Sequence, residues 1–311
     1  MIITDIEQET RNYLNWFLNK KYPNNNLQFR GVSFFPFEVT DAIIRPKNTI
    51  FESVPVLKGT AYRVVENHTS LPQSQTIKLS EKVIDTVTNT TTEGYKVGAG
   101  IKSSTKVSVN IKFLVSGGIE QTFETSFNAE YNYSTTQSIT ETTESLWEVT
   151  EPVNVPPYKR VTASLQIMGA DIEVPMELTG NLKGTQYYYD ELDTKRSFYR
   201  FAAGTYEYAP APGYWVGSIK DIPASDLADS NWPDRPSSFK AKGVNDALYL
   251  EGAGISSLGT ALFSITKFEE TPLSGFEGET KTWYSPQIQL KDGTVIYVPN
   301  INEVIENYRP L

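Results

Sequence analysis

Cysteine is absent from this 311-residue chain, and histidine occurs once, at His68. Without a thiol there is no disulfide, no cysteine nucleophile and no cysteine-bound metal. A single histidine in a polar loop supplies almost nothing for a catalytic triad or a histidine-based metal site. A carboxylate pair for glycoside hydrolysis is the remaining enzymatic alternative, because its two members can lie far apart in the chain. With 37 acidic residues, however, such pairs arise easily by chance. We therefore expect no enzyme, no catalytic residue, no metal and no cofactor.

Positive charge and long apolar runs are also scarce. Lysine and arginine total 28 against 37 acidic residues, which leaves a net charge of −9. No basic cluster is available to neutralise phosphates, so we expect no nucleic-acid partner. The chain contains no run of 18 apolar residues, so the sequence predicts no membrane helix. The first segment, MIITDIEQET, is acidic and has no apolar core, so we expect no signal peptide.

Strand-forming sequence fills most of the chain. Residues 1–21 predict one helix, with Thr4 and Glu7 as a capping box. Serine and threonine concentrate from Thr76 to Ser145 without an interrupting proline. Threonine is β-branched and favours strands, so we predict long, exposed strands on both sides of the hairpin described below. The alternative for this segment is a disordered linker.

The segment that follows is marked by prolines and predicts a second hairpin. Alternation over 161–167 predicts a strand, Gly169-Ala170-Asp171 predicts a turn, and residues 172–178 predict a returning strand. Pro175 places that second strand at an edge or a bulge. Near the C-terminus, Lys291-Asp292-Gly293 predicts another hairpin turn.

The stretch from Lys106 to Tyr131 predicts two amphipathic strands joined by a turn at Gly117-Gly118. Apolar and polar residues alternate, so one face is apolar and the other polar. Each arm has about the 9–11 residues that a tilted strand needs to cross a bilayer. Ordinary half-buried sheet and a membrane-inserting element are the two interpretations. The apolar set is Val107, Val109, Ile111, Phe113, Leu114, Val115, Ile119, Phe123 and Phe127, and the polar set is Ser108, Asn110, Lys112, Glu120, Glu124 and Asn128.

Aromatic residues become dense between Gly184 and Trp232, where proline and glycine interrupt them. Tyrosine combines a flat apolar face with a polar tip, which is typical of surfaces that bind carbohydrates or headgroups. Core packing is the alternative interpretation. The candidates for such a binding surface are Tyr187, Tyr188, Tyr189, Tyr206, Tyr208, Tyr214 and Trp215.

Five features in a fixed order resemble the aerolysin-like β-pore-forming toxins, and in particular their epsilon-toxin/mosquitocidal-toxin branch, which includes insecticidal crystal proteins. They are TTEGYKVG (91–98), the hairpin opened by Lys106-Val107, a second Ser/Thr strand, VNVPPYKRVTASLQIMG (153–169) and KTWY (281–284). The resemblance covers roughly 76–180 well and 281–300 moderately. The tip departs from it, because many relatives carry proline where this chain has Leu-Val-Ser-Gly-Gly.

The resemblance implies a mainly β fold. It would be an elongated aerolysin-like architecture of long twisted antiparallel strands and a β-sandwich, with a short N-terminal helix in a head region. The head, which would bind a receptor, is expected in residues 1–70 and 181–245. The pore-forming region is expected in 71–180 with the insertion hairpin 106–131, and a C-terminal β-sandwich region with the tail in 246–311.

The resemblance also implies an insecticidal toxin that binds a glycan or protein receptor and acts at the target-cell plasma membrane. It would assemble into a homo-oligomer and insert one hairpin per subunit into a transmembrane β-barrel, with the apolar set toward lipid and the polar set toward the lumen. Deposition as a bacterial inclusion, or release by lysis, would precede this. In the monomer the apolar face must be covered, and we predict that it lies against the central sandwich under the Thr-rich strands. The alternative function is a non-lytic, lectin-like carbohydrate-binding protein.

Overall fold

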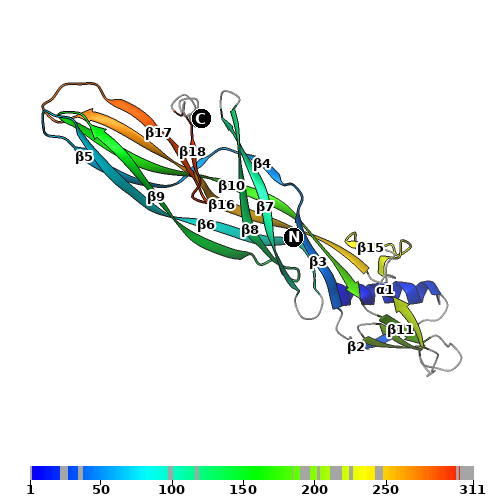
Figure 1. Ribbon diagram of the computed structural model, residues 1–311. Helices are drawn as coiled ribbons and strands as arrows, with labels where there is room; N and C mark the ends of the chain where they lie inside the picture. Colours follow the sequence, from blue (N-terminus) through cyan, green and yellow to red (C-terminus); the bar gives the residue numbers. More distant parts are fainter. Residues whose placement is uncertain are drawn as a thin grey trace.

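The computed structural model describes residues 2–21, 27–33, 38–96, 101–115, 119–183, 185–189, 197–201, 204–210, 219–223, 227–241, 248–298 and 301. The molecule is elongated and mainly β, as predicted, with its long strands running along one axis (Figure 1). One described helix and a small sheet lie at one end of this axis. No helix among the described residues is both long and apolar enough to cross a membrane.

Two strands of 25 residues each form the spine of a ten-stranded sheet. They are β10 (Lys159–Lys183) and β16 (Leu248–Pro272), and they pair antiparallel along their whole lengths. Side chains of β16 alternate between buried and half-buried, because successive residues of a strand point to opposite faces. The other members of the sheet are β1 (Ile2–Asp5), β3 (Glu38–Pro46), β5 (Val56–Glu66), β6 (Gln73–Lys96), β9 (Ile139–Val155), β15 (Phe239–Ala241), β17 (Lys281–Leu290) and β18 (Val295–Tyr297).

The turn predicted at Gly169-Ala170-Asp171 is wrong. These residues lie inside β10, where the pairing with β16 shifts by one residue between Met168 and Gly169. A β-bulge of this kind bends a strand without reversing it. Pro175 does lie at an edge: β5 pairs with β10 only up to Gly169, and β3 pairs with it only from Met176 onward. The predicted turn at Lys291-Asp292-Gly293 is confirmed between β17 and β18.

The Thr-rich segments form strands, as predicted. Strand β6 pairs antiparallel with β9 from Gln73 opposite Val155 to Asn89 opposite Ile139. Hydroxyl groups bond across this ladder, as between Thr88 and Thr140 at 3.1 Å. The polar face is exposed along much of β9, while the opposite face contributes to an apolar cluster with β10. This cluster fills the end of the molecule farther from the helix in Figure 1.

The N-terminal helix begins later than predicted. Residues 2–5 form β1, which pairs parallel with β6, and α1 spans Ile6–Lys21. The capping residue is Asp5 rather than Thr4, because the Asp5 carboxylate accepts a hydrogen bond of 3.1 Å from the Gln8 backbone N–H. Thr4 is drawn into the strand instead. The helix packs through Tyr13, whose ring centroid lies 5.4 Å from that of Trp232.

A separate five-stranded sheet lies beside α1 in Figure 1. It joins β2 (Leu27–Ser33), near the N-terminus, to strands from residues 185–223. Strands β3 and β5, which lie between β2 and β6 in the chain, belong to the ten-stranded sheet. The division of the chain into three functional regions stays a prediction. The other strands of the small sheet are β11 (Thr185–Tyr189), β12 (Ser197–Phe201), β13 (Gly204–Pro210) and β14 (Ile219–Pro223).

Candidate membrane-inserting hairpin

The hairpin predicted over 106–131 is present as two paired strands. Strand β7 (Lys102–Val115) pairs antiparallel with β8 (Ile119–Asn132), from Lys102 opposite Asn132 to Val115 opposite Ile119. Both strands extend beyond the predicted base. The turn at 116–118, including Gly117-Gly118, lies outside the described residues. Figure 1 shows the hairpin crossing the long sheet obliquely rather than joining it.

Burial alternates along the hairpin in the order that the sequence indicates. Its apolar side chains point into the molecule: Val107, Val109, Ile111 and Phe113 are at most 4% exposed, Phe127 is 7% exposed and Phe123 is half-buried. On the other face Ser108, Glu124 and Asn128 are exposed, and Asn110 and Lys112 are half-buried. The side chains of Leu114, Val115, Ile119 and Glu120 lie outside the described residues. The two faces are therefore distinct wherever they are described.

Three phenylalanine rings join the upper part of the hairpin to the long sheet. Phe263 of β16 stacks on Phe123 of β8 with ring centroids 5.0 Å apart, and Phe113 of β7 meets both rings edge-on at 6.0 and 5.3 Å. Such aromatic contacts add to the area that they bury. The predicted cover over the apolar face is thus confirmed, with β16 supplying a central part of it.

Hydrogen bonds join the base of the hairpin to the Thr-rich strand β6. The Tyr131 hydroxyl lies 2.7 Å from Ser256 Oγ on β16, and Ser256 in turn donates to Asn89 Oδ1 at 2.6 Å. Thr91 Oγ1 donates to the backbone carbonyl of Asn132 at 2.8 Å. These bonds satisfy polar groups that are otherwise buried. The predicted contact with a Thr-rich strand is therefore also present.

Glycines allow the base of the hairpin to approach closely. A Cβ atom on Gly254 of β16 would lie 2.3 Å from a ring carbon of Tyr131, and one on Gly94 of β6 would lie 2.2 Å from the carbonyl oxygen of Tyr133. Both separations are far below van der Waals contact. The two glycines are therefore required by the docked hairpin, and Gly254 lies within a strand rather than in a loop.

A pair of buried tyrosines closes the base. The rings of Tyr95 and Tyr133 are 5.3 Å apart, and the Tyr95 N–H donates to the Tyr133 carbonyl at 2.8 Å. Burial away from water raises the pKa of Tyr133 to about 12 and raises that of Tyr95 further. Both phenols are therefore neutral at physiological pH. The Tyr95 hydroxyl finds no hydrogen-bond partner among the described residues.

One short strand holds the outer edge of β7. Strand β4 (Ile50–Ser53) pairs parallel with residues 110–113 of β7, and the Asn110 N–H donates to the Thr49 carbonyl at 2.7 Å. With β8 these strands form a three-stranded sheet of their own, in the order β4-β7-β8. Among the described residues β8 has no partner strand on its outer edge. We refer to β4 below as the latch strand.

The pairing of the latch strand with the hairpin was not predicted from the sequence. No local pattern around Ile50 indicates which strand it pairs with. The pairing is parallel and joins residues that lie 60 positions apart, such as Ile50 and Asn110. Only packing in three dimensions brings them together.

The structure brings several of the predicted receptor tyrosines together through the backbone. Tyr187, Tyr188 and Tyr189 lie on β11, and Tyr206 and Tyr208 lie on β13, with β12 between them. Tyr188 stands opposite Tyr199 of β12, which stands opposite Tyr206, so these three form one row across the sheet. Tyr214 and Trp215 lie outside the described residues.

Within the described part of the chain, no cluster of three or more His, Asp or Glu side chains is arranged to hold a metal ion. The described structure is an elongated β framework with an amphipathic hairpin docked on it. This combination defines the class of aerolysin-like pore-forming proteins.

The chain belongs to the family described as Clostridium epsilon toxin ETX/Bacillus mosquitocidal toxin MTX2, whose sequence profile matches residues 12–282. One relative is the pesticidal crystal protein Cry15Aa of Bacillus thuringiensis subsp. thompsoni. It is 33% identical over 270 residues, which cover 85% of this chain and 73% of Cry15Aa. The family supports a pore-forming toxin of the aerolysin-like type, with insecticidal crystal proteins among its relatives.

Two solved structures share the fold. The structure of the Cry23Aa1 and Cry37Aa1 binary protein complex contains a chain with a TM-score of 0.60 and 24% identity, covering 96% of this chain and 99% of that one. A non-toxic crystal protein from Bacillus thuringiensis aligns with a TM-score of 0.65 and 16% identity, covering 89% of this chain and 100% of that one. At these identities the likeness concerns the fold alone.

Proposed function

We propose that this protein binds a receptor on a target cell, assembles into a ring of identical subunits and inserts the hairpin 106–131 of each subunit into a transmembrane β-barrel. The observation that supports this most directly is the covered apolar face of a hairpin that stands outside the main sheet. Its side chains alternate, its arms match a bilayer, and its backbone ladder is separate from the ten-stranded sheet.

Because the hairpin is not part of the ten-stranded sheet, the free-energy cost of detaching it from the molecule comes from the contacts that hold it in place. Among the described residues, moving the hairpin breaks no strand pairing of the ten-stranded sheet, because the one described strand that pairs with the hairpin is β4. The further contacts to be lost include the Phe263 stack and the bonds through Ser256 and Thr91. The apolar side chains of the hairpin go from a protein core to lipid, so their transfer out of water, roughly 1.5–3 kcal/mol each, is retained. The net cost lies in the sheet surface that the hairpin leaves.

Ring closure is what offsets this cost. A lone hairpin in lipid leaves the N–H and C=O groups of its outer edges without partners, each at a cost of several kcal/mol. The outer edge of β8 already lacks a partner strand among the described residues. We propose that the outer edge of β8 pairs with β7 of the neighbouring subunit, after β4 has left the outer edge of that β7. Insertion then accompanies or follows assembly.

The opposite face of the hairpin would line the pore. Ser108, Asn110, Lys112, Glu120, Glu124 and Asn128 would face the lumen, with Lys106 and Glu130 near the base of the hairpin. With these two included, three acidic residues stand against two basic ones in each subunit. We propose a channel that mildly favours cations, because rings of carboxylates attract them.

The receptor surface is proposed on the five-stranded sheet. The row Tyr188, Tyr199 and Tyr206 crosses three neighbouring strands of this sheet, which lies at the same end of the molecule as α1 in Figure 1. Tyrosine as a residue type combines apolar area with a hydrogen-bonding hydroxyl, which glycan and protein ligands both require. Relatives named as crystal proteins support deposition as an inclusion, followed by action at a target membrane.

Labelled cysteines test the insertion directly, because the chain has no cysteine of its own. Single cysteines at Val109 and Phe123, labelled with an environment-sensitive dye, should report lipid after assembly on receptor-bearing membranes. Their neighbours Asn110 and Glu124 should report water. A label at Tyr62, which is 73% exposed on β5, should stay in water throughout. Equal signals from a residue and its neighbour would contradict the assignment.

A non-lytic, lectin-like protein is the second candidate function. The observation that favours it is the shared fold with a crystal protein described as non-toxic, which means that the fold alone does not decide toxicity. Release of an encapsulated dye from target cells or receptor-bearing vesicles separates the two. A pore former releases the dye, whereas a lectin adheres without release.

A further inference from the structure

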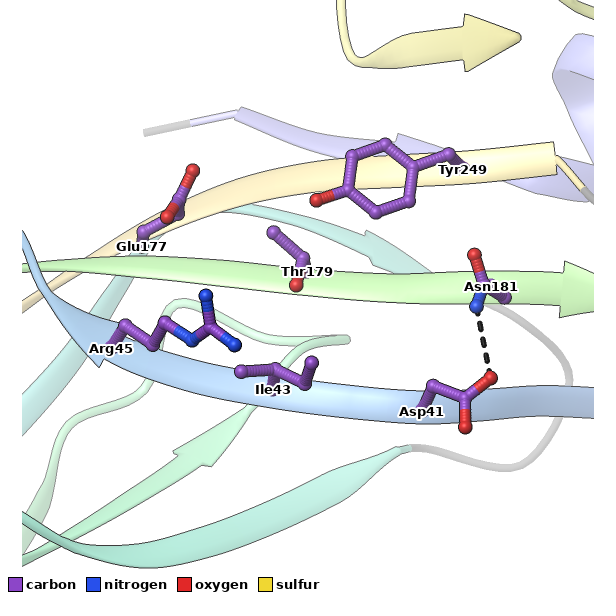
Figure 2. Close-up of a pocket in the computed structure, with 7 residues that line it drawn as sticks. All are labelled: Asp41, Ile43, Arg45, Glu177, Thr179, Asn181 and Tyr249. Carbon is purple, nitrogen blue, oxygen red and sulfur yellow. Dashed lines mark hydrogen bonds between the residues drawn. The ribbon is translucent and has the colours of Figure 1, made fainter. Parts of the chain in front are cut away.

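A shallow groove of about 240 Å³ lies on the outward face of three neighbouring strands, away from the hairpin. Figure 2 shows its side chains: Asp41 and Arg45 from β3, Glu177 and Asn181 from β10, and Tyr249 from β16. The strands run in the order β16-β10-β3, so the groove crosses the sheet. It lies near the end of β10, which leads directly into the tyrosine-bearing strand β11.

The backbone at one end of this groove is irregular. The pairing of β3 with β10 shifts between Thr179 and Asn181, so that an extra residue bulges from β3. Asp41 lies in this bulge with φ at 54°, a conformation that non-glycine residues seldom adopt. Bulges re-aim side chains beside functional sites, and such outliers persist where the surroundings hold them. Here the result is that Asn181 Nδ2 donates to Asp41 Oδ2 at 2.9 Å.

An apolar platform lies beside these polar groups. Tyr249 is half-buried, and its ring faces the viewer across the sheet in Figure 2 rather than standing edge-on. Ile43, which is 39% exposed, lies on the same face. A pyranose ring has an apolar C–H face that stacks on a flat aromatic ring, while its hydroxyls need planar amide, carboxylate or guanidinium partners. Both kinds of surface meet in this groove.

The charges of the groove select among sugars. Arg45 stands opposite Glu177 in register, but among the residues drawn in Figure 2 the one hydrogen bond is that between Asn181 and Asp41. Arg45 and Glu177 therefore present their donors and acceptors beside each other without bonding to each other. Among the described lining residues, two carboxylates stand against one guanidinium, in a protein of net charge −9. Sialylated or sulfated sugars would be repelled.

We infer that this groove is a binding site for a neutral sugar, with Tyr249 as the stacking platform and Asp41, Asn181, Arg45 and Glu177 as hydroxyl partners. The inference deepens the receptor part of the proposed function and rests on it for its biological use. Sugar binding itself requires neither a membrane nor the hairpin. The bulge at Asp41 is the feature that distinguishes the groove from an ordinary polar sheet face.

Saturation-transfer NMR on the full chain tests this site with lactose, N-acetyllactosamine, mannotriose and chitotriose, and with sialyllactose as the anionic comparison. At least one neutral oligosaccharide should receive saturation, and sialyllactose should receive less. Tyr249→Ala should weaken the affinity for that oligosaccharide by about tenfold or more, because the stacking surface is lost. Asn181→Ala should weaken it as well.

Tyr62→Ala is the matched control, since Tyr62 is an exposed tyrosine of the same sheet that does not line the groove. Thermal melting of each variant verifies the fold. Transfer to no neutral sugar, or an affinity unchanged by Tyr249→Ala in a folded variant, overturns the inference. If wild-type protein still releases dye in that case, the pore proposal stands while the groove proposal fails.

The same variants on target cells distinguish a protein-borne sugar from a lipid-borne one. Cells are treated either to remove N-linked glycans or to remove the sugar of glycolipids. Loss of the Tyr249-dependent part of binding under one treatment supports the inference and names the carrier. Persistence of that part under both treatments contradicts it.

Discussion

A disulfide between the latch strand and β7 should stop pore formation without affecting binding. Glu52 of β4 stands opposite Lys112 of β7, and both lie on the face turned away from the core. Neighbouring strands place paired residues about 4.8 Å apart, which suits a disulfide. The double variant Glu52→Cys/Lys112→Cys introduces the only thiols of the chain.

The magnitude follows from what holds the latch. Four residue pairs join β4 to β7. Four backbone hydrogen bonds with a net value of roughly 0.5–1.5 kcal/mol each would total about 2–6 kcal/mol, an amount that ring assembly can overcome. A covalent bond cannot be overcome in this way. Dye release by the oxidised double variant should therefore fall to background and return when a reductant is added.

Weakening the latch should have the opposite effect. Phe51 of β4 is half-buried against the apolar cluster that includes the hairpin. Phe51→Ala should loosen the latch by about 1–2 kcal/mol, which is a factor of about 5–30 in an equilibrium. Dye release should become faster at equal receptor binding.

The assay follows dye release from receptor-bearing vesicles with and without dithiothreitol. Each single-cysteine variant is one control. A second disulfide, Thr60→Cys/Gln166→Cys, joins β5 to β10 within the ten-stranded sheet without joining the hairpin, and should leave release unchanged. Wild-type release rates from the oxidised Glu52/Lys112 variant would refute the reasoning, because the hairpin could not then have left β4.

Three further predictions concern stability. Lys291→Ala should lower the free energy of unfolding by about 1–3 kcal/mol in urea, because it leaves the buried Asp85 carboxylate without the ammonium group 2.8 Å away. The exposed pair Lys78–Glu148 is the matched control, and Lys78→Ala should cost less than about 1 kcal/mol. Tyr95→Phe should be neutral or stabilising in thermal melts, because it removes a buried hydroxyl that has no partner among the described residues; a loss of stability would reveal a partner. Hydrogen bonds from Arg160 and then His68 hold the pKa of Glu66 below its ordinary value, so its contribution to stability is present above the unfolded-state pKa and is lost as pH falls through the folded-state pKa. Glu66→Gln should remove that part of the acid dependence of the urea midpoint, and an unchanged profile would contradict the shift.

The sequence determined the faces of the hairpin, because alternation is a local property. A period of two fixes which side chains share a face, whatever the strand later packs against. The apolar residues from Val107 to Phe113 are therefore buried as a set. The turn at Lys291-Asp292-Gly293 was equally predictable, because Gly293 adopts the positive φ that such a turn needs.

Local sequence patterns gave wrong predictions at two places where the residues are compatible with more than one backbone structure. Gly169-Ala170-Asp171 has the composition of a turn. Its pairing with β16 nevertheless continues on both sides of a bulge, so β10 does not reverse there. Thr4 has a side chain that can cap a helix, yet its pairing with Tyr95 of β6 keeps it in a strand. Asp5 caps the helix instead. In both cases long-range pairing overrode a local preference.

Only the tertiary structure decided what the hairpin touches. Residues far apart in the chain meet at the latch strand, at the Phe263 stack and where Tyr131 packs against Gly254. No period or motif in the sequence encodes such pairs. The groove beside Tyr249 likewise exists because three strands from distant segments lie side by side. The sequence by itself determined that one face of the hairpin is apolar, because alternation is local. Packing decided that this face is covered and which described strand, β4, pairs with the hairpin edge.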